Sequence, residues 1–179
     1  MNLLLRLSRW IDIFNENIGK LATCAVLLSC LISAGNALIR YTFDMSSNAW
    51  LEVQWYLFSA IVLLGGAFVL KMNEHVRVDV FYGTLSPKAK AWVDLLGLLI
   101  FLLPSMYVLT RLSWPLFVES FTSKEMSSNA GGLIRWPVKL LMPVGFAMMI
   151  AQGLSELIKR AAFLGGKYNM DTHYERPLQ

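Results

Sequence analysis

The sequence is poor in residues that could do chemistry inside a membrane. It has only two cysteines and two histidines, and neither histidine lies in one of its long apolar runs. No charged residue lies in the central third of those runs. Ion-coupled transporters, pumps and haem carriers place ionisable groups or axial ligands at that depth. We therefore expect no catalytic, substrate-binding or metal site in this chain, and no cofactor.

Four apolar runs make up most of the sequence, and they lie at residues 18–39, 50–70, 91–112 and 136–158. Each is long enough to cross a bilayer, because a helix needs about 20 residues to span the hydrocarbon. Since 56% of the 179 residues are hydrophobic, little sequence is left for a soluble domain. We predict an all-α, polytopic membrane protein. Its four transmembrane helices form one domain over 18–158, and a tail follows at 159–179.

The first 17 residues have an amphipathic pattern. An apolar stripe is formed by Leu3, Leu4, Leu7, Trp10, Ile11, Phe14 and Ile18, and the charged residues Arg6, Arg9, Asp12 and Glu16 fall mostly on the other side. This pattern is typical of a helix that lies in the membrane interface. We predict a cytoplasmic interfacial helix over residues 1–17. The alternative is a simple extension of the first span.

The distribution of basic residues predicts the orientation of the chain. If the four helices alternate in direction, 11 of the 16 lysines and arginines lie on the side of the termini and 5 lie on the other side. Positively charged loops stay in the cytoplasm, so both termini are expected there. Because flanking charges explain the net charge of +4, we expect membrane lipids as partners and no nucleic acid.

Several features of the runs suggest how the helices pack. Small residues recur at four-residue steps in the first run, at Ala25, Ser29, Ser33 and Ala37. Such a stripe lets another helix approach closely, either within this bundle or on a partner. In the third run, Pro104 should bend the helix. The following connection, residues 113–135, predicts a short interfacial helix and then a turn-rich stretch.

Polar residues cluster at the start of the second run and in the loop after it. Glu52 and Gln54 lie just inside the second run, where a carboxylate either complements the helix dipole or contacts a partner subunit. His75 and Asp79 in the loop could share a helical face. Two ligands without a third do not define a metal site, so a packed surface loop fixed by Arg77 and Asp79 is the better interpretation.

Stretches of the sequence resemble the small membrane subunit, of DctQ type, of tripartite ATP-independent periplasmic (TRAP) transporters. They are NALIRYTF (36–43), EVQWYLF (52–58), NEHVRVDV (73–80), LP (103–104) and GGLIRWPVK (131–139). The resemblance covers about residues 36–160, and its core from His75 to Asp79 is specific. In one departure, Glu52-Val53 stands where many relatives have two consecutive acids, which puts a role for an acidic pair in doubt.

The resemblance implies a complex with a large membrane subunit of DctM type and a periplasmic solute-binding protein. Such complexes sit in the bacterial inner membrane and take up an organic acid with sodium. The large subunit holds the substrate and sodium sites, and the small one enlarges the static scaffold without being an enzyme. A membrane anchor of a redox enzyme complex is the alternative function. Candidate subunit-interface or structural residues are Ser29, Ser33, Asn36, Arg40, Glu52, Gln54, Trp55, Asn73, His75, Arg77, Asp79 and Trp136.

Overall fold

The computed structural model describes residues 2–45, 47–73 and 82–169, and these residues are almost entirely helical. The elements are α1 (Asn2–Phe43), α2 (Asn48–Met72), α4 (Pro87–Gly97), the π-helix η1 (Leu98–Leu102), α5 (Leu103–Thr122) and α6 (Trp136–Leu164). In these residues the only β pairing is an isolated bridge between Met126 and Ile134. Four helical stretches are long and apolar enough to cross a membrane, counting 87–122 as one. The predicted all-α fold with four spans is confirmed.

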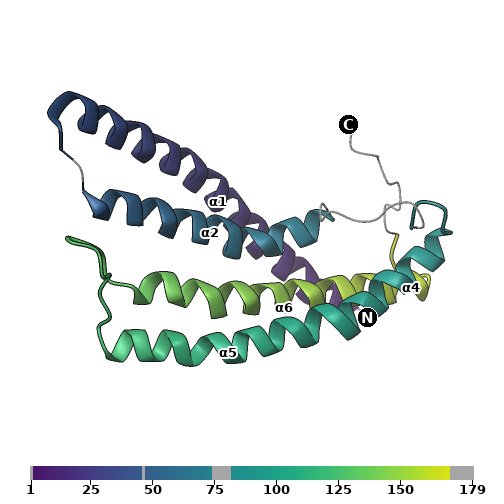
Figure 1. The fold of residues 1–179 in the computed structure, drawn as a ribbon. Coiled ribbons are helices and arrows are strands. Elements are labelled where there is room, and N and C mark those ends of the chain that lie inside the picture. The colour runs from purple at the N-terminus through teal and green to yellow at the C-terminus, as the bar shows by residue number, and fades with distance from the viewer. Residues whose placement is uncertain (1, 46, 74–81, 170–179) are drawn as a thin grey trace.

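The helix α6 forms the centre of the bundle. It contacts α1, α2, α4 and α5, and 39% of its most apolar window is buried, against 6% or less in the other three stretches. Figure 1 shows α5 and α6 running side by side, with α2 beside α6 and α1 crossing the bundle obliquely. Because α1 and α2 contact each other and α6, the first two helices form a pair that rests on α6.

The helices pack through small and polar residues, and their outer surfaces are apolar. Among the described residues only six hydrophobic side chains are buried, and three of them are alanines. Glycines allow close contacts: a Cβ at Gly145 would lie 2.6 Å from the backbone oxygen of Leu63, and one at Gly19 would lie 2.5 Å from Phe68 Cγ. In lipid, where apolar burial gives little driving force, such packing holds helices together.

The first helix is twice as long as a membrane span requires. Its 42 residues extend about 63 Å at 1.5 Å per residue, against a hydrocarbon thickness of about 30 Å. Residues 2–17 continue the helix of the first span without a break. No helix therefore ends at residue 17, where the sequence predicted a boundary. The placement of residues 2–17 in the membrane interface stays a prediction.

The third span contains a π-helical turn directly before its proline. The backbone N–H of Leu103 donates to the carbonyl oxygen of Leu98, one residue farther back than in an α-helix. This π turn precedes Pro104, which has no N–H to donate, and Figure 1 shows the helix curving between α4 and α5. The separate interfacial helix predicted after Ser113 is wrong, because α5 continues through Pro115 to Thr122.

Candidate functional site

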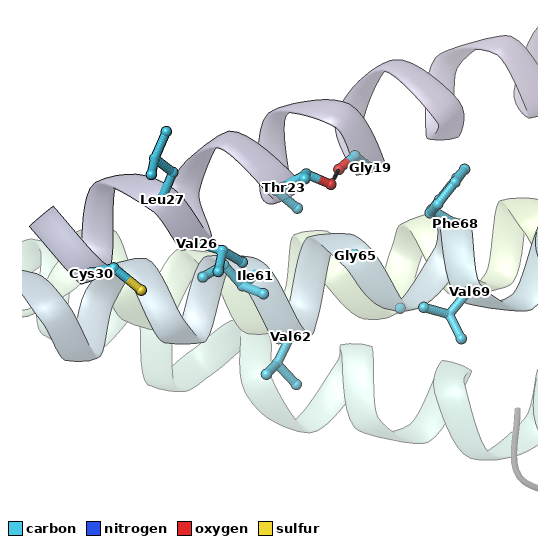
Figure 2. Close-up of a pocket in the computed structure, with 12 residues that line it drawn as sticks. Gly19, Thr23, Val26, Leu27, Cys30, Ile61, Val62, Gly65, Phe68 and Val69 are labelled. Carbon is cyan, nitrogen blue, oxygen red and sulfur yellow. Dashed lines mark hydrogen bonds between the residues drawn. The ribbon is translucent and has the colours of Figure 1, made fainter. Parts of the chain in front are cut away.

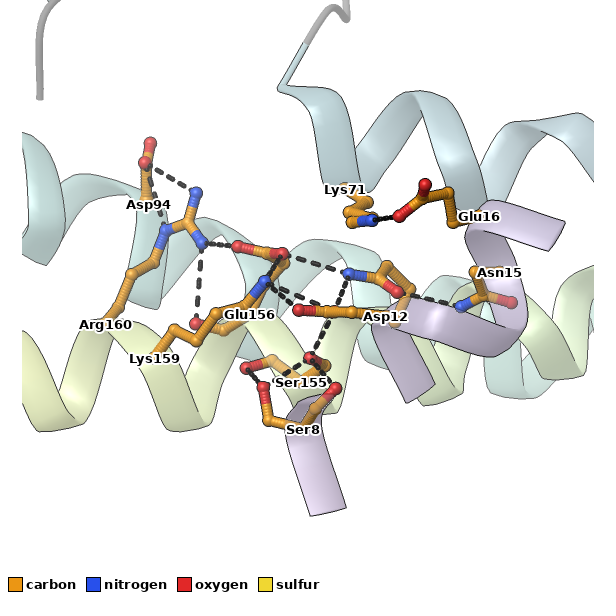
Figure 3. A network of polar contacts seen from close by, with 11 residues as sticks. Ser8, Asp12, Asn15, Glu16, Lys71, Asp94, Ser155, Glu156, Lys159 and Arg160 are labelled. Carbon is orange, nitrogen blue, oxygen red and sulfur yellow. Dashed lines mark hydrogen bonds and ion pairs between the residues drawn. The ribbon is translucent and has the colours of Figure 1, made fainter. Parts of the chain in front are cut away.

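A polar network joins α1 to α6 at the end of the bundle near the N-terminus (Figure 3). Its buried neutral part begins with Ser8 and Ser155, whose hydroxyl oxygens lie 2.7 Å apart. Farther along α1, Asn15 Nδ2 donates to Gln152 Oε1 at 2.8 Å. All four side chains are almost fully buried. Hydrogen bonds between polar side chains therefore hold α1 against α6.

Charged side chains extend this network from α1 to α4. Lys159 Nζ lies 3.0 Å from Asp12 Oδ2 and also pairs with Glu156. Arg160 pairs with Glu156 and places Nε and Nη2 each 3.1 Å from Asp94 Oδ2. Glu156 and Arg160 are only 5% and 4% exposed, so each depends on its partners for solvation. Lys159, Glu156 and Arg160 each contact two oppositely charged side chains, so the network compensates these charges collectively.

A neighbouring ion pair attaches α1 to α2. Glu16 accepts from Lys71 Nζ at 2.7 Å and lies 2.9 Å from Lys20 Nζ on its own helix. Figure 3 shows this pair beside the main network. At the end of the bundle near the N-terminus, side-chain contacts thus join α1, α2, α4 and α6, and the described acids of the network are all paired.

Sequence reasoning missed this network. The amphipathic pattern predicts that Asp12 and Glu16 face water, on the side away from the apolar stripe. In the structure their side chains instead contact α6 and α2. The signal was present as two polar stripes of helical spacing. One stripe is Ser8, Asp12 and Asn15, and the other is Gln152, Ser155, Glu156 and Lys159. Two such stripes in a membrane protein are expected to face each other, because each buries the polar groups of the other.

At the opposite end of the bundle, Glu52 holds a small hairpin in the connection between α5 and α6. Its carboxylate accepts hydrogen bonds from Leu133 N at 2.6 Å, from Asn129 Nδ2 at 2.9 Å and from Ser127 Oγ. The side chain is buried, with 3% exposure of the residue. Glu52 is therefore engaged within its own chain, with donors of the 127–133 hairpin and not with the N–H groups at the start of its own helix.

The backbone of the hairpin explains the two adjacent glycines of the GGLIRWPVK stretch. Ser127 N donates to Leu133 O, and Arg135 N donates to Glu125 O, both at 2.9 Å. Gly131 has a φ of +69°, a conformation that side chains disfavour. A Cβ at Gly132 would lie 2.5 Å from Ser127 Cβ and 2.9 Å from Glu52 Oε1. The first glycine makes the turn, and the second leaves room for the carboxylate.

The salt bridge between Glu125 and Lys139 closes the base of this hairpin. The hydrogen bond from Lys139 holds the pKa of Glu125 below its usual value of 4.5. Tyr56 of α2 donates to Ile134 O at 2.9 Å, and Asn48 Nδ2 donates to Ala130 O at 3.0 Å. The hairpin is therefore anchored to α2 at several points and to α6 at one.

Two more candidate residues have structural roles. Asn73 ends α2 with a φ of 60°, a left-handed conformation that asparagine tolerates, and its N–H donates to Leu70 O. Trp136 begins α6 and packs edge-on against Phe121 of α5, with 5.4 Å between the ring centres. His75, Arg77 and Asp79 lie outside the described residues.

The remaining candidates are less enclosed. Ser33, Arg40 and Trp55 are exposed, while Ser29, Asn36 and Gln54 are half-buried. Gln54 Nε2 has no hydrogen-bond partner among the described residues. The predicted small-residue stripe is therefore covered by the described helices only in its N-terminal half, at Ala25 and Ser29.

An apolar groove of about 720 Å³ lies between α1 and α2. Figure 2 shows it lined by Gly19, Thr23 and Cys30 from α1 and by Val62, Gly65 and Val69 from α2, among others. The hydroxyl of Thr23 donates to the backbone oxygen of Gly19 at 3.1 Å, so it is satisfied within its own helix. The groove presents apolar surface and no charged side chain.

Comparison with known families identifies the chain. The family model described as "Tripartite ATP-independent periplasmic transporters, DctQ component" matches residues 29–163, well over half of the sequence. The chain belongs to this family. It is a small permease subunit of a TRAP transporter and a multi-pass membrane protein. No curated protein and no solved structure matches it. This assignment decides for the transporter over the redox-enzyme anchor that the sequence left open.

The matched region of the DctQ component includes the Glu52 hairpin and the α6 residues of the polar network near the N-terminus, and it begins after Gly19 and Lys20. The α1 side of the network, from Ser8 to Glu16, lies outside the match. The first turns of α1 are thus a part of this chain to which the family assignment does not extend.

Proposed function

We propose that this DctQ component is the non-catalytic small subunit of a sodium-coupled transporter that imports an organic acid. In this proposal a large membrane subunit carries the substrate and sodium sites, and a periplasmic solute-binding protein delivers the acid. The small subunit lies in the bacterial inner membrane with both termini in the cytoplasm. Its role is to enlarge the fixed scaffold against which the large subunit moves.

The observation that carries this proposal is that the most buried carboxylates are already engaged. Glu52 accepts from three donors of the outer hairpin, and Glu156 is paired with Lys159 and Arg160. A coupling cation needs oxygen ligands that the protein leaves available. Between the two polar ends, the described helices expose mainly apolar side chains. This distribution favours a scaffold over a site of ion coupling.

We propose that the outer half of the small-residue stripe meets the large subunit. Ser33 and Ala37 are both exposed, and they continue the face of α1 that begins at the groove with Cys30. Small side chains allow a partner helix to approach closely. Replacing Ser33 by leucine should therefore reduce co-purification of the large subunit, whereas phenylalanine at the exposed Leu27 should be tolerated better.

Reconstitution tests the scaffold role. The solute-binding protein is first screened by thermal shift against a panel of carboxylates, and the stabilising acid is then used in radiolabelled form. The small subunit alone should give no sodium-dependent uptake into liposomes, and addition of the large subunit and loaded binding protein should restore it. Uptake by the small subunit alone would refute a scaffold role.

The orientation is tested by labelling single cysteines in intact cells. With the native cysteines replaced, a cysteine at Lys124 should react with a membrane-impermeant maleimide, because the hairpin end is expected in the periplasm. A cysteine at Lys88, before the third span, should react only after the cells are permeabilised. Labelling of the Lys88 position in intact cells would reverse the proposed topology.

A further inference from the structure

The first 16 described residues of α1, here called the N-terminal arm (residues 2–17), cross α6 at a steep angle. Along α1, seven residues separate Ser8 from Asn15, but their partners Ser155 and Gln152 are only three residues apart on α6. The same two contacts are about 10 Å apart on one helix and about 4.5 Å apart on the other. The arm therefore runs across α6 near the inner end of the fourth span, which the sequence places at residue 158.

The outward surface of the arm contains an apolar face. Leu3, Leu7, Trp10 and Phe14 lie three or four residues apart, so they share one side of the helix. They are 77%, 53%, 73% and 56% exposed. An apolar face next to the inner end of a membrane span is expected to lie in the boundary between headgroups and acyl chains.

The exposed charges on the outward surface of the arm are positive. The acids of the arm turn inward, where Asp12 pairs with Lys159 and Glu16 pairs with Lys71. Arg6 and Arg9 are exposed and have no ion pair or hydrogen bond with the described residues. Both arginines, with Asn2, Leu3 and Leu5, line a hollow of about 440 Å³. The internal network thus leaves the arm with an uncompensated positive surface beside its apolar face.

We propose that Arg6 and Arg9 bind the phosphate groups of anionic lipids in the cytoplasmic leaflet. A planar guanidinium matches two phosphate oxygens, and the neighbouring apolar face would lie against the acyl chains of the same leaflet. The inference goes beyond the transport function and does not depend on the substrate. Each basic residue at an anionic surface contributes up to about fivefold in affinity, so two arginines should give up to roughly 25-fold preference for anionic over zwitterionic lipid.

Lipid titration with native mass spectrometry tests this site on the full chain. Phosphatidylglycerol and phosphatidylcholine of identical acyl chains are added separately, and the bound fractions are compared. Wild type should prefer phosphatidylglycerol by at least about fivefold, and R6Q/R9Q should reduce this preference toward one. R6K/R9K should keep most of it, because the charge is retained. K88Q/K167Q removes two exposed charges elsewhere and should behave as wild type.

The outcomes distinguish a lipid site from a protein-binding surface. A preference that survives in R6Q/R9Q, or that is lost equally in K88Q/K167Q, overturns the proposal. Lipid preference that is unchanged while R6Q/R9Q releases the large subunit also overturns it, and indicates an acidic protein surface as the partner. If R6Q/R9Q fails to fold, as judged by helical circular dichroism, wild type still provides the test. Its preference must fall as salt rises, because exposed charges are screened.

Discussion

Replacing Gly19 by alanine should separate α1 from α2, and Gly35 on the same helix provides a matched control. A Cβ at Gly19 would lie 2.5 Å from Cγ and 2.8 Å from Cβ of Phe68, whereas one at Gly35 would have no atom within 4 Å. Phe68 cannot yield cheaply, because the atoms in conflict lie next to its backbone. Overpacking of this kind costs about 1 to 3 kcal/mol.

The G35A control accounts for the second effect of replacing glycine by alanine, which is the change in helix propensity. Alanine is a better helix former than glycine by about 1 kcal/mol, and this gain applies to both positions. The difference in unfolding free energy between G35A and G19A should therefore be the steric cost alone, about 1 to 3 kcal/mol in favour of G35A. Reversible unfolding of the purified chain in mixed micelles, followed by circular dichroism, measures this difference.

A double-mutant cycle tests whether the contact with Phe68 causes the loss of stability in G19A. In the F68A background the ring atoms are gone, so the penalty of G19A should shrink markedly. If G19A is as stable as G35A, or if its penalty is the same with and without the Phe68 ring, the close contact does not hold the two helices together and the reasoning is refuted.

Two further predictions concern the hairpin held by Glu52. E52A should increase amide hydrogen exchange at Ser127 and Arg135 by at least about tenfold, because three donors lose their acceptor, whereas E119A should leave it unchanged. Equal protection in both variants would contradict the anchoring role. The carboxyl of Glu125 should titrate below 4.5, and its stabilising effect should be complete above that pH and lost as pH falls through the lowered pKa. In K139Q the pKa measured by carbon NMR should rise toward 4.5, and no change would contradict the assigned cause.

The spans could be predicted from the sequence because hydropathy alone decides them. Apolar runs of about 20 residues with no charge in their central third predicted the four membrane-crossing helices, and they fall within the observed elements. The exact ends could not be predicted, since α1 and α5 continue as helix beyond the apolar part. Pro115 illustrates the reason: a proline tolerated inside α5 is indistinguishable in sequence from one that ends a helix.

The candidate site was predicted less completely than the spans. The sequence placed Glu52 at a helix start, but its partners are more than 70 residues away and share no local pattern with it. The sequence does contain a signal for the network at the other end, in the form of two polar stripes. The stripe on α1, however, overlaps an amphipathic pattern that equally fits a helix lying in the membrane interface. The close contact at Gly19 was not predicted, because Gly19 lies outside the regular four-residue spacing that begins at Ala25.

The positions of the two polar clusters explain how a chain with few buried hydrophobic side chains holds a fixed shape. Apolar side chains in lipid gain little by meeting each other, so contacts in the middle of the bundle rely on close approach at residues such as Gly19 and Gly145. Ion pairs at the end of the bundle near the N-terminus and the Glu52 hairpin at the opposite end fix the helices where polar groups cost least to bury. In the proposed scaffold role the helices must not slide when the large subunit moves, and polar contacts at both ends of the bundle would meet that need without placing a charge at the midplane.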